Sequence, residues 1–182
     1  MDSNAYVEEL ERRCGKSAAV FFDASAQDGP QIGIIGFDNY PVAGEYTYFS
    51  YGLHRLEKPE WTHGVPEYFI VIDCPNRSFA SYFGYLISEF GFEKTMAWNT
   101  LLGVGEEDAI DGYPYRWVAF ASPEYLDWDD YIIVPKAGLP IHLGMGYFIS
   151  NNDFQTVRER GISFLNEKTE VDYEYWKRIQ KA

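Results

Sequence analysis

Cys74 is the side chain of this sequence best placed for nucleophilic chemistry. A reactive thiolate needs a helix N-terminus or a cation beside it, and Cys74 lies just before a predicted helix. However, the carboxylate of Asp73 disfavours a neighbouring thiolate. Pro75 is the next residue, and no catalytic motif surrounds Cys74. The sequence therefore favours a packing cysteine, and a small cysteine- or histidine-dependent enzyme remains as the alternative.

Three histidines, His54, His63 and His142, are the other candidates for acid–base or metal chemistry. His54 and His63 are separated by a loop, and no cysteine or carboxylate stands near them at a zinc-ligand spacing. Cys14 and Cys74 also lack the spacing of a metal or redox motif, so both are expected to be free, buried thiols. The sequence predicts neither a metal nor a cofactor.

Glycine pairs and carboxylates form no recognisable catalytic motif. The pair Gly103 and Gly105 is followed by acidic residues that would repel a phosphate. The pair Gly144 and Gly146 instead indicates close backbone approach inside a strand. Because the carboxylates stand in loop clusters rather than in pairs that flank a pocket, glycosidase chemistry is disfavoured.

The acidic residues are concentrated in one stretch that is also rich in aromatic rings. From Glu106 to Asp130 there are eight acidic residues and one basic residue, a net −7 out of −13 for the whole chain. In binding surfaces, aromatic rings supply desolvated anchors and rim charges steer the partner. The predicted partner-binding residues are Glu106, Glu107, Asp108, Asp111, Tyr113, Tyr125, Asp127, Trp128, Asp129 and Asp130. A solvated acidic face whose aromatic rings turn into the core fits the pattern nearly as well.

Length and charge limit the remaining possibilities. A chain of 182 residues suits one domain, and a net charge of −13 disfavours nucleic acid and anionic membranes as partners. No basic start followed by an apolar run precedes the first helix, and no apolar run is long enough to span a membrane. We therefore expect a cytoplasmic monomer or weak dimer whose partner is a basic protein.

A central strand organises the predicted fold. Over residues 45–51, Tyr46, Tyr48 and Ser50 share one face and Thr47, Phe49 and Tyr51 the other. Aromatic and β-branched residues on both faces indicate a strand that is covered on both sides.

Helices are predicted at 2–14, from Asn76 to Phe90, from Ser150 onward and, shorter, near 171–179. Further strands are predicted at 18–22, 32–38, 68–72, 95–102, 116–121, 131–134 and 141–149. The sequence thus predicts a single α+β domain over residues 1–182, with its core at about 18–168 and a mostly antiparallel mixed sheet packed by two or three helices.

The central strand and the final elements resemble the suppressor-of-fused domain family, in particular its short bacterial members. Residues 45–53, Glu-Tyr-Thr-Tyr-Phe-Ser-Tyr-Gly-Leu, are similar to the family strand Thr-x-x-Thr/Ser-x-Gly-Leu/Met-Ser. The strands at 68–72 and 141–149 and the helix that carries Phe154, Arg158, Glu159 and Gly161 follow in the family's order. His54 departs from the pattern, because the family more often has Ser or another small polar residue there.

The resemblance implies a compact binding domain with no known catalysis. Bacterial members are often regarded as immunity proteins that neutralise a toxin encoded nearby, which would make a basic toxin domain the partner. Animal members hold an extended peptide between two domains, and this chain has only one. A regulatory module that binds a peptide at a sheet edge is therefore a further alternative.

Overall fold

The computed structural model describes residues 3–90, 100–103, 110–121, 125–134, 138–160 and 164. Three α-helices lie in these ranges: α1 (Ser3–Cys14), α2 (Arg77–Phe90) and α3 (Asn151–Arg160). The strands are β1 (Val20–Asp23), β2 (Gly33–Asp38), β3 (Tyr46–Tyr51), β4 (Val65–Ile72), β5 (Leu101–Gly103), β6 (Tyr115–Ala121), β7 (Ile132–Ile133) and β8 (Ile141–Ser150), and a 3₁₀ turn, η1, spans Leu53–Arg55.

The eight strands form one sheet in the order β1-β2-β3-β4-β8-β6-β5, and β7 pairs with β8 off this path. Strands β1 to β4 follow one another as an antiparallel meander. Only the pairing of β4 with β8 is parallel among the described strands. The structure therefore confirms the predicted α+β domain with a mostly antiparallel mixed sheet.

The central strand is covered on both faces, as its composition predicts. Gly146 of β8 lies so close to Phe83 of α2 that a Cβ at this position would be 2.9 Å from the ring. The ladder joins Gly146 to Ile70 and Ile70 to Tyr48, so these residues share the face that α2 covers. Successive strand residues point to opposite sides, and Phe49 therefore faces away from α2.

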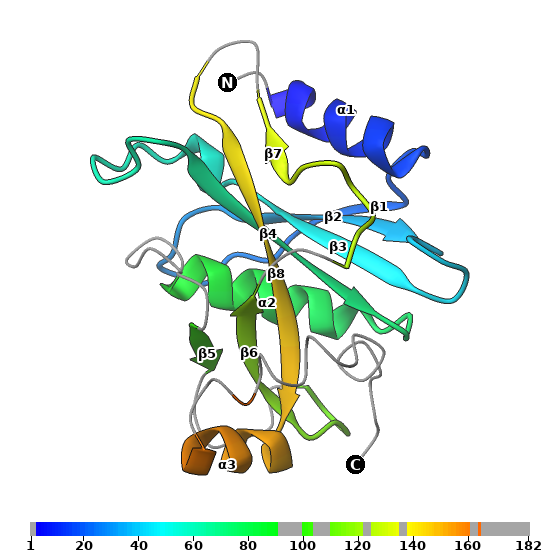
Figure 1. Ribbon diagram of the computed structural model, residues 1–182, viewed down its shortest axis with the longest axis vertical. Helices are drawn as coiled ribbons and strands as arrows, with labels where there is room; N and C mark the ends of the chain where they lie inside the picture. The colour runs from blue at the N-terminus through cyan, green and yellow to red at the C-terminus, as the bar shows by residue number, and fades with distance from the viewer. Residues whose placement is uncertain are drawn as a thin grey trace.

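Helix α1 covers part of the opposite face. Its apolar stripe predicts this packing, and Tyr6 and Leu10 are fully buried. The Tyr6 hydroxyl donates a hydrogen bond to the carbonyl oxygen of Ser50 at 3.2 Å, which ties the helix to β3. Figure 1 shows α1 beside β7 at one end of the molecule and α3 at the other, with α2 lying across the sheet between them.

Several predicted boundaries differ from the observed ones. The buried run predicted at 68–72 begins three residues earlier, at Val65, and thereby includes Glu67. The strand predicted at 131–134 is reduced to Ile132–Ile133. Of the strand predicted at 95–102, residues 95–99 lie outside the described part of the chain, as does the helix predicted near 171–179. None of the helices in the described ranges is long and apolar enough to cross a membrane.

Candidate functional site

The second half of the acidic stretch packs on the sheet face opposite α2. Trp128 stacks on Phe49 of β3, with ring centroids 5.9 Å apart and planes at 8°. Its indole Nε1–H donates a hydrogen bond of 2.7 Å to the Tyr40 hydroxyl, and its ring also stacks on Tyr131 at 6.1 Å. Trp128 is therefore half-buried and engaged within the chain.

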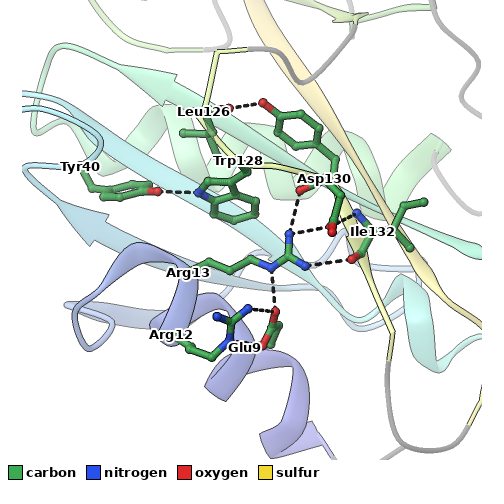
Figure 2. A network of polar contacts seen from close by, with 9 residues as sticks. Glu9, Arg12, Arg13, Tyr40, Leu126, Trp128, Asp130 and Ile132 are labelled. Atoms are coloured by element: carbon green, nitrogen blue, oxygen red, sulfur yellow. Dashed lines mark hydrogen bonds and ion pairs between the residues drawn. The ribbon is translucent and has the colours of Figure 1, made fainter.

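Arg13 of α1 fastens this segment to the rest of the domain, and Figure 2 shows the contacts. Its guanidinium donates to the carbonyl oxygens of Asp130 at 2.8 Å and Ile132 at 2.9 Å. It also forms ion pairs with Glu9 at 2.7 Å and with the Asp130 carboxylate at 2.9 Å, and it lies 5.2 Å from the centre of the Trp128 ring. Hydrogen bonds from Arg13 and then from the Ile132 N–H hold the pKa of Asp130 below its usual value.

Replacing Arg13 by methionine is expected to destabilise the domain by about 2 kcal/mol, because charge-assisted hydrogen bonds to two carbonyl groups are lost. The side chain is only 13 % exposed, so solvent cannot fully replace these bonds. Urea denaturation measures the loss. Arg12 is the matched control, since it pairs with the same Glu9 at 2.7 Å but is 68 % exposed. An Arg12→Met variant with an equal shift in urea midpoint would contradict the role assigned to Arg13.

Two aromatic side chains of the acidic stretch, Tyr113 and Trp128, lie on opposite faces of the sheet. Tyr113 packs edge-on against Phe79 of α2, with ring centroids 5.0 Å apart, whereas Trp128 lies on the α1 side. The Tyr125 hydroxyl donates to the carboxylate of the buried Glu45, at 2.8 Å from the nearer oxygen. The aromatic side chains thus make contacts within the domain, as in the second interpretation offered by the sequence.

The predicted binding residues with exposed carboxylates are Asp111, Asp127, Asp129 and Asp130. Glu106, Glu107 and Asp108 lie outside the described residues. A binding role for any member of the set stays a prediction.

A buried polar cluster around Glu67 was not anticipated from the sequence. Glu67 is fully buried, and its Oε1 accepts hydrogen bonds from the backbone N–H groups of Gly52 at 2.9 Å and His54 at 3.0 Å. The ring Nδ1 of His54 lies 2.6 Å from the same oxygen, and the Ser50 hydroxyl donates to Oε2 at 2.5 Å. Burial, and next the charge of Glu67, raise the pKa of Tyr6 well above its usual value.

Gly52 makes this cluster possible. Its φ of 141° is a conformation that favours glycine, and a Cβ there would lie 2.4 Å from the carbonyl oxygen of Gln31. The chain can therefore turn sharply from β3 into η1, which brings the N–H groups of Gly52 and His54 onto the carboxylate of Glu67.

The order of groups in the cluster does not suit nucleophilic catalysis. In a serine hydrolase the imidazole contacts the nucleophile, but here Glu67 lies between Ser50 and His54. Ser50 also accepts a 2.8 Å hydrogen bond from the Tyr68 N–H and is fully buried. The cluster instead closes the gap where β3 and β4 diverge, since their ladder ends at Phe49 and Phe69.

A pocket of about 870 Å³ opens beside this cluster. Its lining includes His54, Arg55, Lys58, Trp61, Val65 and Leu139. The Nε2 atom of His54 is buried and has no hydrogen-bond partner among the described residues. One signal in the sequence could have indicated the site: a glutamate inside an otherwise apolar strand requires buried partners.

The cysteines are free thiols, as predicted. Cys14 is buried, and burial raises the pKa of its thiol to about 12, so it is protonated at neutral pH. Cys74, which was predicted to be buried, is only partly buried. Within the described ranges, no group of three or more His, Cys, Asp or Glu side chains is arranged to hold a metal ion.

Similarity to known proteins is found in the three-dimensional fold and not in the sequence. No family profile matches the sequence, and no curated protein matches it. A suppressor-of-fused homologue from Neisseria gonorrhoeae matches with a TM-score of 0.69 and 10 % identity, over 99 % of this chain and 94 % of that one. The Sufu–Fu complex contains a chain that matches with a TM-score of 0.67 and 13 % identity, over 99 % of this chain and 90 % of that one.

Drosophila Suppressor of Fused matches with a TM-score of 0.60 and 12 % identity over 98 % of this chain, which spans half the length of that protein. The resemblance suggested by the central strand and the final elements is thus confirmed in three dimensions. This chain has the fold of the suppressor-of-fused proteins.

Proposed function

We propose that this chain is a non-enzymatic protein-binding domain, and that it acts as an immunity protein that neutralises a basic toxin by direct binding. The observation that carries the proposal is the shared fold, because one structure with this fold is the Sufu–Fu complex. The geometry around Glu67 supports a scaffold rather than a catalyst, since the carboxylate holds the hydroxyl and the imidazole apart.

The charge of the chain supports a basic partner. A net charge of −13 accelerates association with a cationic surface, and this effect weakens as salt screens the charges. The exposed carboxylates of Asp127 and Asp129 make the 125–130 segment the face we assign to the encounter. Trp128 and Tyr125 anchor this segment through the stacking on Phe49 and the hydrogen bond to Glu45.

Co-expression with the product of the adjacent gene tests the proposed role. The chain is expected to relieve toxicity and to form a complex that survives gel filtration. A Cys74→Ala variant should protect equally well, because the proposal assigns no chemistry to this thiol. Full loss of protection in that variant, with the complex intact, would instead favour the enzyme alternative.

Charge reversal locates the interface. The double variant Asp127→Lys/Asp129→Lys is expected to slow association with the basic partner by roughly tenfold at low salt, because electrostatic steering is reversed there. Asp130 is left unchanged, because its carboxylate pairs with Arg13 and its loss would disturb the segment itself. Stopped-flow association rates at two salt concentrations provide the measurement.

The matched control is Asp28→Lys/Glu89→Lys, which changes the net charge equally at two other exposed positions. Gly29, next to Asp28, touches Ser88, next to Glu89, so this control pair is also local. Equal slowing by the two double variants would show that only net charge matters and would place the interface elsewhere.

A further inference from the structure

The pocket beside η1 has a composition unlike that of the chain as a whole. In a chain with 28 acidic and 15 basic residues, its lining includes two cations, Arg55 and Lys58, and one carboxylate, Glu57. Apolar side chains, among them Trp61 and Leu139, form most of the remaining wall. The volume of about 870 Å³ lies within the range of small-molecule sites.

Arg55 is held in place rather than free to swing. Its guanidinium donates a hydrogen bond to the Tyr51 hydroxyl and lies 4.2 Å from the centre of the Tyr51 ring. Tyr51 in turn packs edge-on against the His54 ring at 5.1 Å. A cation fixed in this way loses little side-chain freedom on meeting an anion, which favours binding.

His54 lines the pocket with its backbone rather than with its imidazole. Its side chain is fully buried, and Glu67 holds the ring through Nδ1. Within the described part of the chain, the other nitrogen, Nε2, has no hydrogen-bond partner, although an unsatisfied buried polar atom costs about 1–3 kcal/mol. The imidazole thus lies behind the pocket wall, and Arg55 and Lys58 supply the charged groups of the lining.

We propose that this pocket binds a carboxyl group carried on an apolar body. The cations Arg55 and Lys58 meet the carboxylate, and Trp61 and Leu139 contact the apolar part. Two sources carry this chemistry, namely the free carboxyl terminus of a peptide that ends in a large apolar residue, and a free aryl- or alkyl-carboxylic acid.

Titration of the ¹⁵N-labelled full chain with 4-phenylbutyrate tests the proposal. Saturable shifts are expected at the Trp61 indole N–H and at the amides of Arg55 and Lys58. The uncharged 4-phenylbutyramide is expected to bind roughly tenfold more weakly, because the charge-assisted hydrogen bonds are lost. N-acetyl-Ala-Ala-Phe, compared with its C-terminal amide, tests the peptide source, and whichever acid binds more tightly identifies the source.

Variants separate the pocket from the rest of the surface. Lys58→Met is expected to weaken phenylbutyrate binding several-fold, and Arg55→Met provides a second variant if the first does not fold. Arg158→Met is the control, because Arg158 is an exposed cation of α3 at the other end of the molecule (Figure 1).

Equal affinity for the acid and the amide, shifts that map outside the pocket, or an absence of saturation would each overturn the proposal. The proposed binding of a carboxyl group does not depend on toxin binding. Lys58→Met should leave the association rate with a basic partner unchanged, so the two proposals fail separately.

Discussion

Replacing Glu67 by alanine is expected to lower the free energy of unfolding by about 3–5 kcal/mol, the usual cost of removing one partner from a buried charged network. The substitution leaves buried donors on Ser50, Gly52 and His54 without their common acceptor. It also opens space at the point where β3 and β4 part. Urea denaturation followed by tryptophan fluorescence measures the loss.

Two further variants show whether the carboxylate itself is responsible. Glu60→Ala removes the same side chain from an exposed position of the neighbouring loop and should change stability by no more than about 0.5 kcal/mol. Glu67→Gln should cost less than Glu67→Ala, because the amide oxygen still accepts the backbone hydrogen bonds. A Glu67→Ala domain as stable as Glu60→Ala would contradict the structural role of the cluster.

Trp128→Ala is expected to destabilise the domain by about 3 kcal/mol, the lower end of the range for large-to-small changes at packed aromatic positions. The indole loses its stacking on Phe49, its hydrogen bond to Tyr40 and its contact with Arg13. Thermal or urea denaturation checks the value. Because the ring is half-buried rather than fully buried, a larger effect is not expected.

Phe21 provides the matched aromatic control. It is 61 % exposed on the edge strand β1, and Phe21→Ala should cost less than about 1 kcal/mol, the value of its single edge-on contact with Tyr51. The comparison also bears on function. If Trp128→Ala retained full stability and lost affinity for a protein partner, the ring would be a binding anchor, and the packing role assigned to it would be wrong.

Patterns with strong local signals could be predicted from the sequence. The period-2 arrangement of Tyr46 to Tyr51 predicts a strand buried on both faces, and the burial of every residue from Thr47 to Tyr51 confirms it. The apolar stripe from Phe79 to Phe90 predicts α2, in which Phe79, Phe83, Leu86 and Ile87 are fully buried and Phe90 is partly buried. These features depend on neighbours along the chain, so periodicity is enough to identify them.

Contacts between distant segments could not be predicted in this way. Arg13 meets Asp130 across 117 positions and Ile132 across 119, and nothing near Arg13 in the sequence indicates either partner. The same holds for Trp128 and Tyr40, which are 88 positions apart. The acidic stretch therefore looked like one surface, although Tyr113 and Trp128, which lie on either side of β6 in the sequence, pack on opposite faces of the sheet.

The sequence by itself determined the class of fold, the central strand and the acidic balance of this protein, because composition and short-range periodicity encode all three. Only the tertiary structure decided which polar side chains are buried together and which aromatic rings turn inward. Glu67 shows the physical reason. A carboxylate in an apolar strand is destabilising unless donors surround it, and those donors arrive only when the turn at Gly52 places Ser50 and His54 around it.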